Sequence, residues 1–424
     1  MSRRVLYLAE NAISPIQGGG IVVYALLRGI APEDLFGFYT YDNITPAPEY
    51  GSCMHLLPRS DGRDEQLYRP AIGPGAVREN AIDLNLRRVR ALARHLADRA
   101  LERDSRAAIA RIDHSGFRPE VVFTAPLTYR MLRLARTLAA HYAVPVVMLN
   151  MDDWMSDQAA SWGPLGGYLR AAVAAEMRAI APATTLALSN SARLADVLTQ
   201  RYAIRHETVN NACYDLLRGG PFVPPGRREG PAVIVFGGAL NWHLQGETLV
   251  LFSYALAELA TRRPVELHIY TPWEFAPIAN QVSIPGKVVY KGFCAKDELV
   301  KHYLEADFLV ATTTFVERNI HLFRHSLATK LSDYLSAGRP VLSIGHPEWA
   351  VHDYVEEHGA GVAIRGPRIQ DMKRALAGAL DWSDERRAVV GRANRELWQR
   401  AHDIKVMGAK ARAALGLGPV PAEL

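Results

Sequence analysis

Short apolar runs alternate with helical runs along almost the whole chain, and this alternation constrains the fold more than any other feature. The runs at 5–9 and 232–236, for example, are each followed by glycine and then by a helical pattern. Strands buried on both faces read as continuous apolar runs, and strand–helix–strand units place them in parallel sheets. The sequence therefore predicts an α/β protein with two doubly wound parallel sheets.

The expected elements form two series, separated by a segment rich in glycine and proline at 219–226. Pro and Gly without periodicity indicate a connection rather than an element. The expected strands lie at 5–9, 120–123, 145–149, 185–188, 232–236, 265–270, 288–290, 307–310 and 341–344. The expected helices lie at 21–30, 128–141, 167–180, 246–261 and 329–337, and the chain from Arg368 onward is expected to be helical.

These elements predict an N-terminal domain at 1–217, a linker at 218–231 and a C-terminal domain at 232–390. Helices at 391–424 are expected to pack back on the N-terminal domain. Ligands of doubly wound sheets bind outside the carboxyl ends of the strands, so the expected site is a cleft between the two domains.

An arginine-rich segment at about 59–118 interrupts the alternation, with a helix expected from 85 to 112. Its apolar residues recur at roughly helical spacing. One interpretation is an inserted helix that packs on the N-terminal domain and exposes a basic face to solvent. The other is a surface that contacts a membrane or a lipid-linked acceptor.

Composition excludes several classes of protein. Lysine and arginine together number 49 against 44 acidic residues, so the net charge is slightly positive. No lysine precedes Lys287, and such a preference for arginine over lysine is typical of GC-rich bacterial genomes. Cys53, Cys213 and Cys294 are scattered, which argues against a disulfide framework or a zinc site. The sequence contains no basic patch interleaved with aromatic residues, the pattern that would indicate binding to nucleic acid.

The location expected from the sequence is the cytoplasm. The first residues run directly into a strand without a hydrophobic leader. No apolar run approaches the roughly 20 residues that cross a bilayer. A peripheral contact with the inner face of the plasma membrane is left open by the arginine-rich surface.

The stretch from Arg324 to Leu342 carries the strongest functional signal. A helix is expected to start at Thr329, and helix N-termini favour anions. A lysine in a first turn opposes the usual dipole preference, which is explained if Lys330 faces a phosphate. Asp333 lies one turn later, where it can accept hydrogen bonds from hydroxyl groups. This pattern suits a nucleoside diphosphate with its sugars.

Three further motifs follow predicted strands. Glycines at 18–20 and at 237–238 let the backbone approach a ligand closely, and Asn241 belongs to the second of these turns. Asp152 and Asp153 end another strand. Their spacing is not that of a metal-chelating Asp-x-Asp motif, so we expect Asp153 to orient an acceptor or to support the catalytic loop.

Taken in order, these blocks resemble GT-B glycosyltransferases of the GT4-type (glycosyltransferase group 1) superfamily, over most of the chain. The most specific block is 329–341, which reads TKLSDYLSAGRPV. The others gain weight from their order and spacing, and they are 18–20, 151–154, 176, 188–191, 236–238 and 289–293. The resemblance implies a GT-B fold of two Rossmann-like domains, with the acceptor on the first and the nucleotide sugar on the second.

The resemblance also implies roles for individual residues. Asp333 matches the acid that holds the ribose hydroxyls, and Phe293 follows the backbone that flanks the base. The expected catalytic residues are Lys330, His325 and Asp153. The expected donor-binding residues are Gly19, Gly20, Gly238, Asn241, Phe293, Arg324, Ala328, Thr329 and Asp333.

Two positions depart from the family pattern. His325 stands eight residues before Asp333, where the family commonly has a glutamate. The segment 239–246 lacks the Arg and Lys that often neutralise the leaving diphosphate, for which Lys330 and Arg324 are candidates to compensate.

We therefore expect a retaining, metal-independent glycosyltransferase that needs no cofactor. Its donor would be a UDP-, GDP- or dTDP-linked sugar, and its acceptor a saccharide, a lipid-linked saccharide or a small molecule. Two alternatives stay open at this point: a non-catalytic protein that binds nucleotide sugars, and a nucleotide-sugar epimerase on the same architecture.

Overall fold

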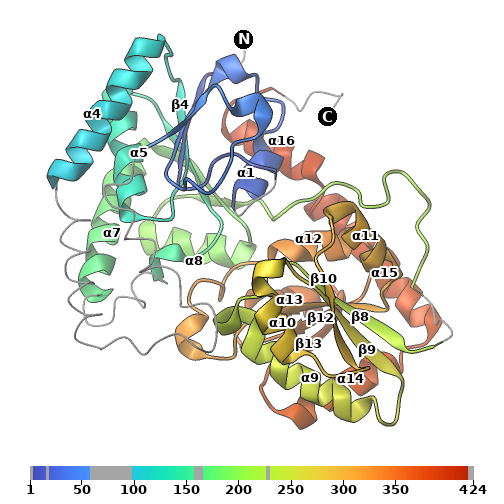
Figure 1. Cartoon of the computed structure of the whole chain (residues 1–424). Coiled ribbons are helices and arrows are strands. Elements are labelled where there is room, and N and C mark those ends of the chain that lie inside the picture. Colours follow the sequence, from blue (N-terminus) through green and yellow to red (C-terminus); the bar gives the residue numbers. More distant parts are fainter. Residues whose placement is uncertain (1–2, 16–18, 58–97, 157–165, 226–229, 419–424) are drawn as a thin grey trace. The chain divides into compact units, whose positions relative to one another are not determined.

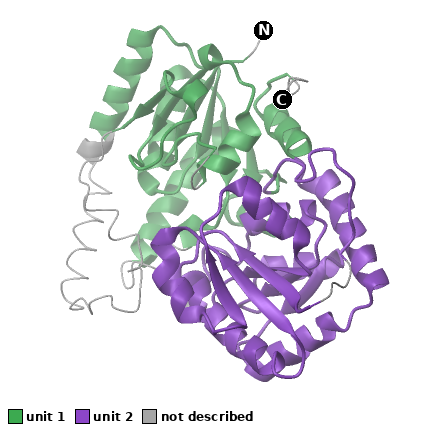
Figure 2. Ribbon diagram, turned by 45° about the vertical axis from the view of Figure 1, so that its right-hand side comes forward, with its two compact units in different colours: residues 1–69, 77–210, 404–424 green, residues 70–76, 211–403 purple. Residues whose placement is uncertain are grey.

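The computed structural model describes residues 3–15, 19–57, 98–156, 166–225 and 230–418 (Figure 1). These residues form two compact units, which are coloured separately in Figure 2. The first unit contains the described residues up to Asn210 together with those from Ile404 onward. The second unit contains the described residues of 211–403.

The first unit is built on a parallel sheet of seven described strands, in the order β3-β2-β1-β4-β5-β6-β7. Its central strands are buried along their whole length, as expected for strands covered on both faces. The strands are β1 (Val5–Ala9), β2 (Leu35–Tyr39), β3 (Met54–Leu56), β4 (Val121–Ala125), β5 (Val146–Asn150), β6 (Thr184–Ser189) and β7 (His206–Thr208).

Helices connect these strands, and two of them begin at a side chain that satisfies a backbone amide. Thr128 accepts from the amide of Met131, and Ser191 accepts from that of Leu194. The helices are α1 (Gly20–Leu27), α4 (Asp98–Ser115), α5 (Tyr129–Tyr142), α7 (Gly166–Ile180), α8 (Ala192–Tyr202) and α16 (Ile404–Ala414), with short 3-10 turns at Pro32–Asp34, Pro48–Tyr50 and Ala181–Ala183. The last helix, α16, packs against α1.

The second unit has a parallel sheet of six described strands, in the order β10-β9-β8-β11-β12-β13. The strands are β8 (Ala232–Gly237), β9 (Val265–Tyr270), β10 (Val288–Gly292), β11 (Phe308–Thr312), β12 (Val341–Ile344) and β13 (Gly361–Ile364). The helices are α9 (Glu247–Leu259), α10 (Ala276–Val282), α11 (Lys296–Glu305), α12 (Thr329–Ser336), α13 (Ala350–Glu357), α14 (Ile369–Leu380) and α15 (Asp384–Ala401). A π-helical turn at Trp242–Gly246 and 3-10 turns at Trp273–Phe275 and Glu317–Asn319 complete the unit.

Both faces of this second sheet are covered. Ile234 and Phe236 of β8 belong to an apolar cluster that includes α9 and α14, which lie side by side in Figure 1. Val235 belongs to a second cluster that includes α12 and α15. Successive side chains of a strand point to opposite faces, so one apolar strand supplies both clusters.

The prediction of two doubly wound parallel sheets is confirmed. Every strand expected from the sequence is present, within two residues at each end. Four strands were not expected: β2, β3, β7 and β13. Strands β3 and β7 are only three residues long, and β2 contains Gly37. Strands β3, β7 and β13 also lie at the edges of their sheets, where the apolar signal is weakest.

The contacts divide the chain at other points than the sequence indicated. The chain passes from the first unit to the second after Asn210 rather than after 217, and the segment from 211 to 217 packs in the second unit. Helix α15 also belongs to the second unit, where it packs on α12, and only the part from Ile404 onward returns to the first. Residues 59–97 of the arginine-rich segment lie outside the described residues.

A buried ion pair secures the start of β11. Arg387 of α15 donates to Asp307 at 2.5 Å, and both side chains are almost inaccessible to solvent. The other carboxylate oxygen of Asp307 accepts from the amide of Val233 at 2.8 Å. Removing one partner of such a pair leaves an uncompensated buried charge, which typically costs about 3–5 kcal/mol.

We predict that Arg387→Met lowers the free energy of unfolding by about 3–5 kcal/mol because it strands the Asp307 carboxylate. Chemical denaturation of the full chain measures the effect. The matched control is Arg392→Met, on the exposed face of the same helix, which we expect to change stability by less than about 0.5 kcal/mol. Equal effects of the two substitutions would show that the pair contributes nothing.

Candidate functional site

The order of the strands locates a candidate site in the second unit. The chain runs outward in one direction from β8 to β10 and in the other from β11 to β13. The adjacent strands β8 and β11 therefore form the switch point, where Ile234 pairs with Phe308. Doubly wound sheets bind ligands beyond the carboxyl ends of such strands. Here those ends carry Gly237 and, after β11, the loop that leads to α12.

The turn after β8 requires glycine at two consecutive positions. Gly238 has a φ of +107°, a backbone conformation that L side chains rarely adopt. A Cβ on Gly238 would also lie 2.8 Å from Cε of Lys330, and one on Gly237 would lie 2.1 Å from the hydroxyl of Tyr303. The two glycines therefore let helices α11 and α12 approach the end of β8 closely.

Helix α12 begins beside this turn without a capping side chain. Ala328 precedes its first residue, Thr329, and makes no side-chain hydrogen bond to the first-turn amides. Thr329 is exposed. Uncapped first-turn amides carry the positive end of the helix dipole, which favours an anion. The start of α12 can therefore accommodate an anion, and its role as the diphosphate loop stays a prediction.

Lys330 reaches from the first turn of α12 to the end of β8. Its Nζ lies 3.9 Å from the centroid of the Phe236 ring and 3.4 Å from the carbonyl oxygen of Ala239. None of the ion pairs found among the described residues involves this amine. Burial lowers the pKa of Lys330 to about 7, since desolvation disfavours the charged form. A phosphate nearby would supply the missing negative charge.

Asp333 lies one turn beyond Lys330 on the same face of α12. Burial raises the pKa of this carboxyl, and the positive charge of Lys296 and a hydrogen bond from the Cys213 thiol act in the opposite direction. Burial raises the pKa of Tyr303, and Tyr334 and the negative charge of Asp333 act in the same direction. The role of Asp333 as the reader of ribose hydroxyls stays a prediction.

The other predicted donor residues of the second unit are distributed along the same edge. Asn241 starts the π-helical turn and accepts from the amide of His243 at 3.0 Å, so its side-chain oxygen caps that turn. Phe293 follows β10 and exposes 65% of its surface. His325 lies half-buried in the loop that precedes α12. For all three, contact with a donor stays a prediction.

Arg324 is engaged by two carboxylates of its own unit. Its guanidinium forms ion pairs with Glu317 and Glu348, and His346 lies 2.7 Å from Glu317. Ligand atoms of Glu317, His346 and Glu348 lie within 4.8 Å of one another, as a metal site would require, but both carboxylates already form ion pairs with Arg324. The donor role of Arg324 stays a prediction and would need an ion pair to open.

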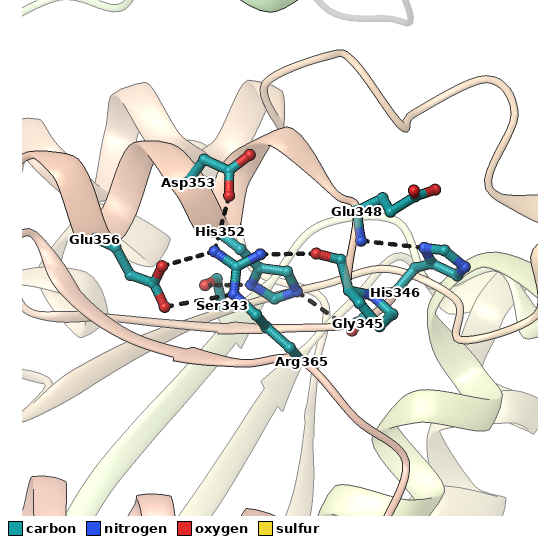
Figure 3. A network of polar contacts seen from close by, with 9 residues as sticks. Ser343, Gly345, His346, Glu348, His352, Asp353, Glu356 and Arg365 are labelled. Carbon is teal, nitrogen blue, oxygen red and sulfur yellow. Dashed lines mark hydrogen bonds and ion pairs between the residues drawn. The ribbon is translucent and has the colours of Figure 1, made fainter.

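A buried network holds the loop that carries His346 and Glu348 (Figure 3). His352 contacts Ser343 at 2.9 Å and the carbonyl oxygen of Gly345 at 3.2 Å. Burial lowers the pKa of His352 to about 4, so the imidazole is neutral and can both donate and accept. The end of β12 is thereby fixed.

In the first unit, the predicted glycines pack against the loop after β1. A Cβ on Gly20 would lie 2.4 Å from the carbonyl oxygen of Ala12, and one on Gly19 would lie 2.7 Å from Cε of Met151. Gly19 precedes the first residue of α1 and offers no capping side chain. The backbone contact explains why glycine is needed at Gly20, and the contact of Gly19 and Gly20 with a sugar diphosphate stays a prediction. Gly18 lies outside the described residues.

Asp153 is held by four hydrogen bonds. Arg201 donates to both of its oxygens, at 2.9 and 3.1 Å, and Ser156 donates through its amide at 3.2 Å and its hydroxyl at 2.8 Å. A carboxylate has about four acceptor positions, so this one is fully used. The structure gives Asp153 a structural role at the start of a helical turn, and its catalytic role stays a prediction.

Glu10, which none of the sequence motifs indicated, occupies the switch point of the first sheet between β1 and β4. It is 2% exposed and accepts from the amide of Leu127 at 2.7 Å and the hydroxyl of Thr128 at 2.5 Å. Burial raises the pKa of Glu10 to about 7. The available signal was a single acid directly after a buried strand.

Among known proteins, this chain is similar to solved structures in its fold. No family model matches the chain, and none of the curated proteins matches it. Among solved structures, it resembles an α,α-trehalose-phosphate synthase (UDP-forming) from Burkholderia xenovorans, at 14% identity and a TM-score of 0.64 over 97% of this chain and 100% of that one. Anabaena HepE, solved with UDP and glucose, matches at 11% identity and a TM-score of 0.62 over 98% and 99%.

Sucrose-phosphate synthase from Thermosynechococcus elongatus matches at 11% identity and a TM-score of 0.61, over 98% of each chain. The fold of this chain is therefore the GT-B fold, as the resemblance implied. In the part of the chain that the structure describes, no helix is long and apolar enough to cross a membrane.

A pH-dependent stability follows from Glu10. Its folded pKa of about 7 exceeds the ordinary value of 4.5, so the folded state binds the proton more tightly than the unfolded state. The resulting stabilisation is complete below about pH 4.5 and is lost as the pH rises through 7. We predict that Glu10→Gln, which mimics the protonated carboxyl, gains about 3 kcal/mol relative to the wild type between pH 4.5 and 7.5.

Denaturant unfolding at several pH values measures this difference. The control is Glu33→Gln, an exposed acid of the same unit, for which we expect a flat difference. A flat difference for Glu10→Gln as well would refute the assignment of a raised pKa.

Proposed function

We propose that this protein is a glycosyltransferase that transfers a sugar from a nucleoside diphosphate to a hydroxyl acceptor. The observation that carries the proposal is the start of α12 in the second unit. The N-terminus of this helix is uncapped, and Lys330 of its first turn approaches the glycine turn without a carboxylate partner in the described structure. Asp333 lies one turn later on the same helix face. The GT-B fold and the UDP bound to HepE support this interpretation.

The chemistry of the donor assigns a role to each group. The first-turn amides and Lys330 would bind the diphosphate, and Asp333 would accept hydrogen bonds from the ribose. Phe293, at the end of β10, would flank the base. The acceptor would bind the first unit, as the resemblance to GT-B glycosyltransferases implies.

The proposed reaction is a retaining transfer. The bond between the anomeric carbon and the diphosphate oxygen breaks, and the acceptor oxygen forms the new bond on the same face. The acceptor proton passes to the departing diphosphate. Charge that develops on this leaving group is stabilised by donors already in place, which is the largest contribution that a fixed site can make. Lys330 and the α12 amides would supply those donors, and no metal is required.

Two alternatives share the same donor site. A non-catalytic binder is favoured by His325, which replaces the usual glutamate, and by the absence of an Arg/Lys pair from 239–246. An epimerase would act on the donor alone. We also propose that the acceptor can be lipid-linked, in which case the protein would contact a membrane peripherally.

An assay of donor consumption separates these functions. We expect UDP-, GDP- or dTDP-sugars to release the nucleoside diphosphate at a rate that rises severalfold when a saccharide acceptor is added. Binding without release would identify a non-catalytic protein. A new nucleotide sugar formed without any acceptor would identify an epimerase.

Lys330 generates a sharper prediction. Its pKa of about 7 leaves the amine mostly neutral at pH 8, whereas an adjacent diphosphate favours the ammonium form. Binding of UDP, GDP or dTDP at pH 8 should therefore take up close to one proton. Affinity should fall by up to tenfold per pH unit between pH 7.5 and 9.5, a range in which the phosphate itself no longer titrates.

Calorimetry in two buffers of different ionisation enthalpy measures this proton uptake. Lys330→Met should bind the nucleotide at least tenfold more weakly and take up no proton. Lys301→Met, an exposed lysine of α11, should match the wild type. Retained affinity and proton uptake in Lys330→Met would remove Lys330 from the site.

A further inference from the structure

The side-chain amide of Asn11 lies buried at the carboxyl end of β1, beside the switch point of the first sheet. Asn11 follows the last residue of β1 by two positions and exposes 5% of its surface. Its side chain makes no hydrogen bond to any other residue in the described part of the chain. Buried polar side chains are hydrogen-bonded in the large majority of cases, so this amide requires an explanation.

The backbone that carries this amide is fixed on both sides. The hydroxyl of the fully buried Tyr7 donates to the carbonyl oxygen of Asn11 at 2.9 Å. The preceding carbonyl oxygen, that of Glu10, accepts from the amides of Thr40 at 3.2 Å and Tyr41 at 2.9 Å. These contacts fix the point from which the Asn11 side chain extends, and none of them uses its amide.

The amide faces the start of α1. A Cβ on Gly19, the residue before this helix, would lie 3.0 Å from Nδ2 of Asn11 and 2.7 Å from Cε of Met151. Because Gly19 has no side chain, the Asn11 amide can approach the helix this closely. Gly19 also provides no side-chain cap, so the first-turn amides of α1 are donors that a ligand can use.

These groups match a sugar hydroxyl better than they match an anion. The Asn11 amide both donates and accepts, as a hydroxyl does, whereas the oxygens of an ionised phosphate only accept. A hydroxyl that lies between Asn11 and α1 can accept from a first-turn amide and donate to Oδ1 of Asn11. Adjacent hydroxyls of one sugar ring can use both parts of the amide.

We propose that Asn11 binds a hydroxyl of a sugar ring that lies against the start of α1. This inference rests on the proposed function and deepens it, because it assigns sugar recognition in the first unit to a residue outside the sequence motifs. The ring belongs either to the donor or to the acceptor, and a binding measurement and a kinetic measurement separate these two sources.

Calorimetry with UDP and UDP-glucose tests the donor as the source of the ring. If the wild type prefers another base, GDP with GDP-mannose or dTDP with dTDP-glucose replaces this pair. If the donor supplies the ring, Asn11→Ala weakens binding of the nucleotide sugar about three- to tenfold, the range of one hydrogen bond. Binding of the nucleoside diphosphate, which lacks the ring, should not change.

Steady-state kinetics tests the acceptor, with the saccharide that most accelerates donor consumption by the wild type. If the acceptor supplies the ring, Asn11→Ala raises the KM for this saccharide about three- to tenfold and leaves binding of both nucleotides unchanged. Asn11→Ser should lose less than Asn11→Ala because its hydroxyl still donates and accepts. The control is Asn43→Ala, an exposed asparagine of the same unit, which should match the wild type in both measurements.

An unchanged affinity for the nucleotide sugar together with an unchanged acceptor KM in Asn11→Ala would overturn the proposal. Equal losses for the nucleoside diphosphate and the nucleotide sugar would also overturn it, because Asn11 would then act on the nucleotide or on the fold. Asn11→Leu, an apolar side chain of similar shape, provides the same test if Asn11→Ala does not fold. A wild type that neither binds a nucleoside diphosphate nor consumes a nucleotide sugar would overturn the proposed function instead.

Discussion

The parallel pairing of β8 with β11 is the constraint on which the second unit depends. It sends the chain in opposite directions on the two sides of the pair, which places a switch point at the carboxyl ends of these two strands. A glycine turn and the start of α12 lie beside this switch point. A φ of +107° at Gly238 and the close approach of the Lys330 side chain are consequences of this arrangement.

Charge is distributed differently around the two switch points. In the second unit, Lys330 is a cation without an ion-pair partner among the described residues, next to uncapped amides. In the first unit, Glu10 is an acid satisfied by two donors. Other charged side chains of the two units are paired, as for Arg387 with Asp307 and Arg201 with Asp153. An amine beside uncapped amides, with no ion-pair partner among the described residues, is the feature that calls for an anionic ligand.

Much of the architecture could be predicted because buried parallel strands are apolar along their whole length. Positions 329–341 could be interpreted as a helix start followed by a buried strand, and α12 and β12 confirm this interpretation. The short strands β3 and β7 could not be predicted, since three residues carry no period. The contacts assign 211–217 to the second unit because this segment packs against α12, a tertiary contact that turn-forming residues do not reveal.

The chemistry of single residues was harder to predict than the fold. The pattern around Lys330 and Asp333 was visible because a lysine is unusual in a first helical turn. Asp153 is bound by an arginine 48 residues away in the sequence. The ion-pair partners of Arg324 lie 7 and 24 residues away, and no local motif indicates any of these contacts.

The central claim is that the start of α12 binds a nucleoside diphosphate. A crystal structure of the chain with the tightest-binding of UDP, GDP and dTDP tests it most directly. The account predicts phosphate oxygens within hydrogen-bond distance of the amides of Thr329 and Lys330 and of the Lys330 amine, with the ribose on Asp333. A diphosphate bound elsewhere, with the start of α12 left to solvent, would contradict it.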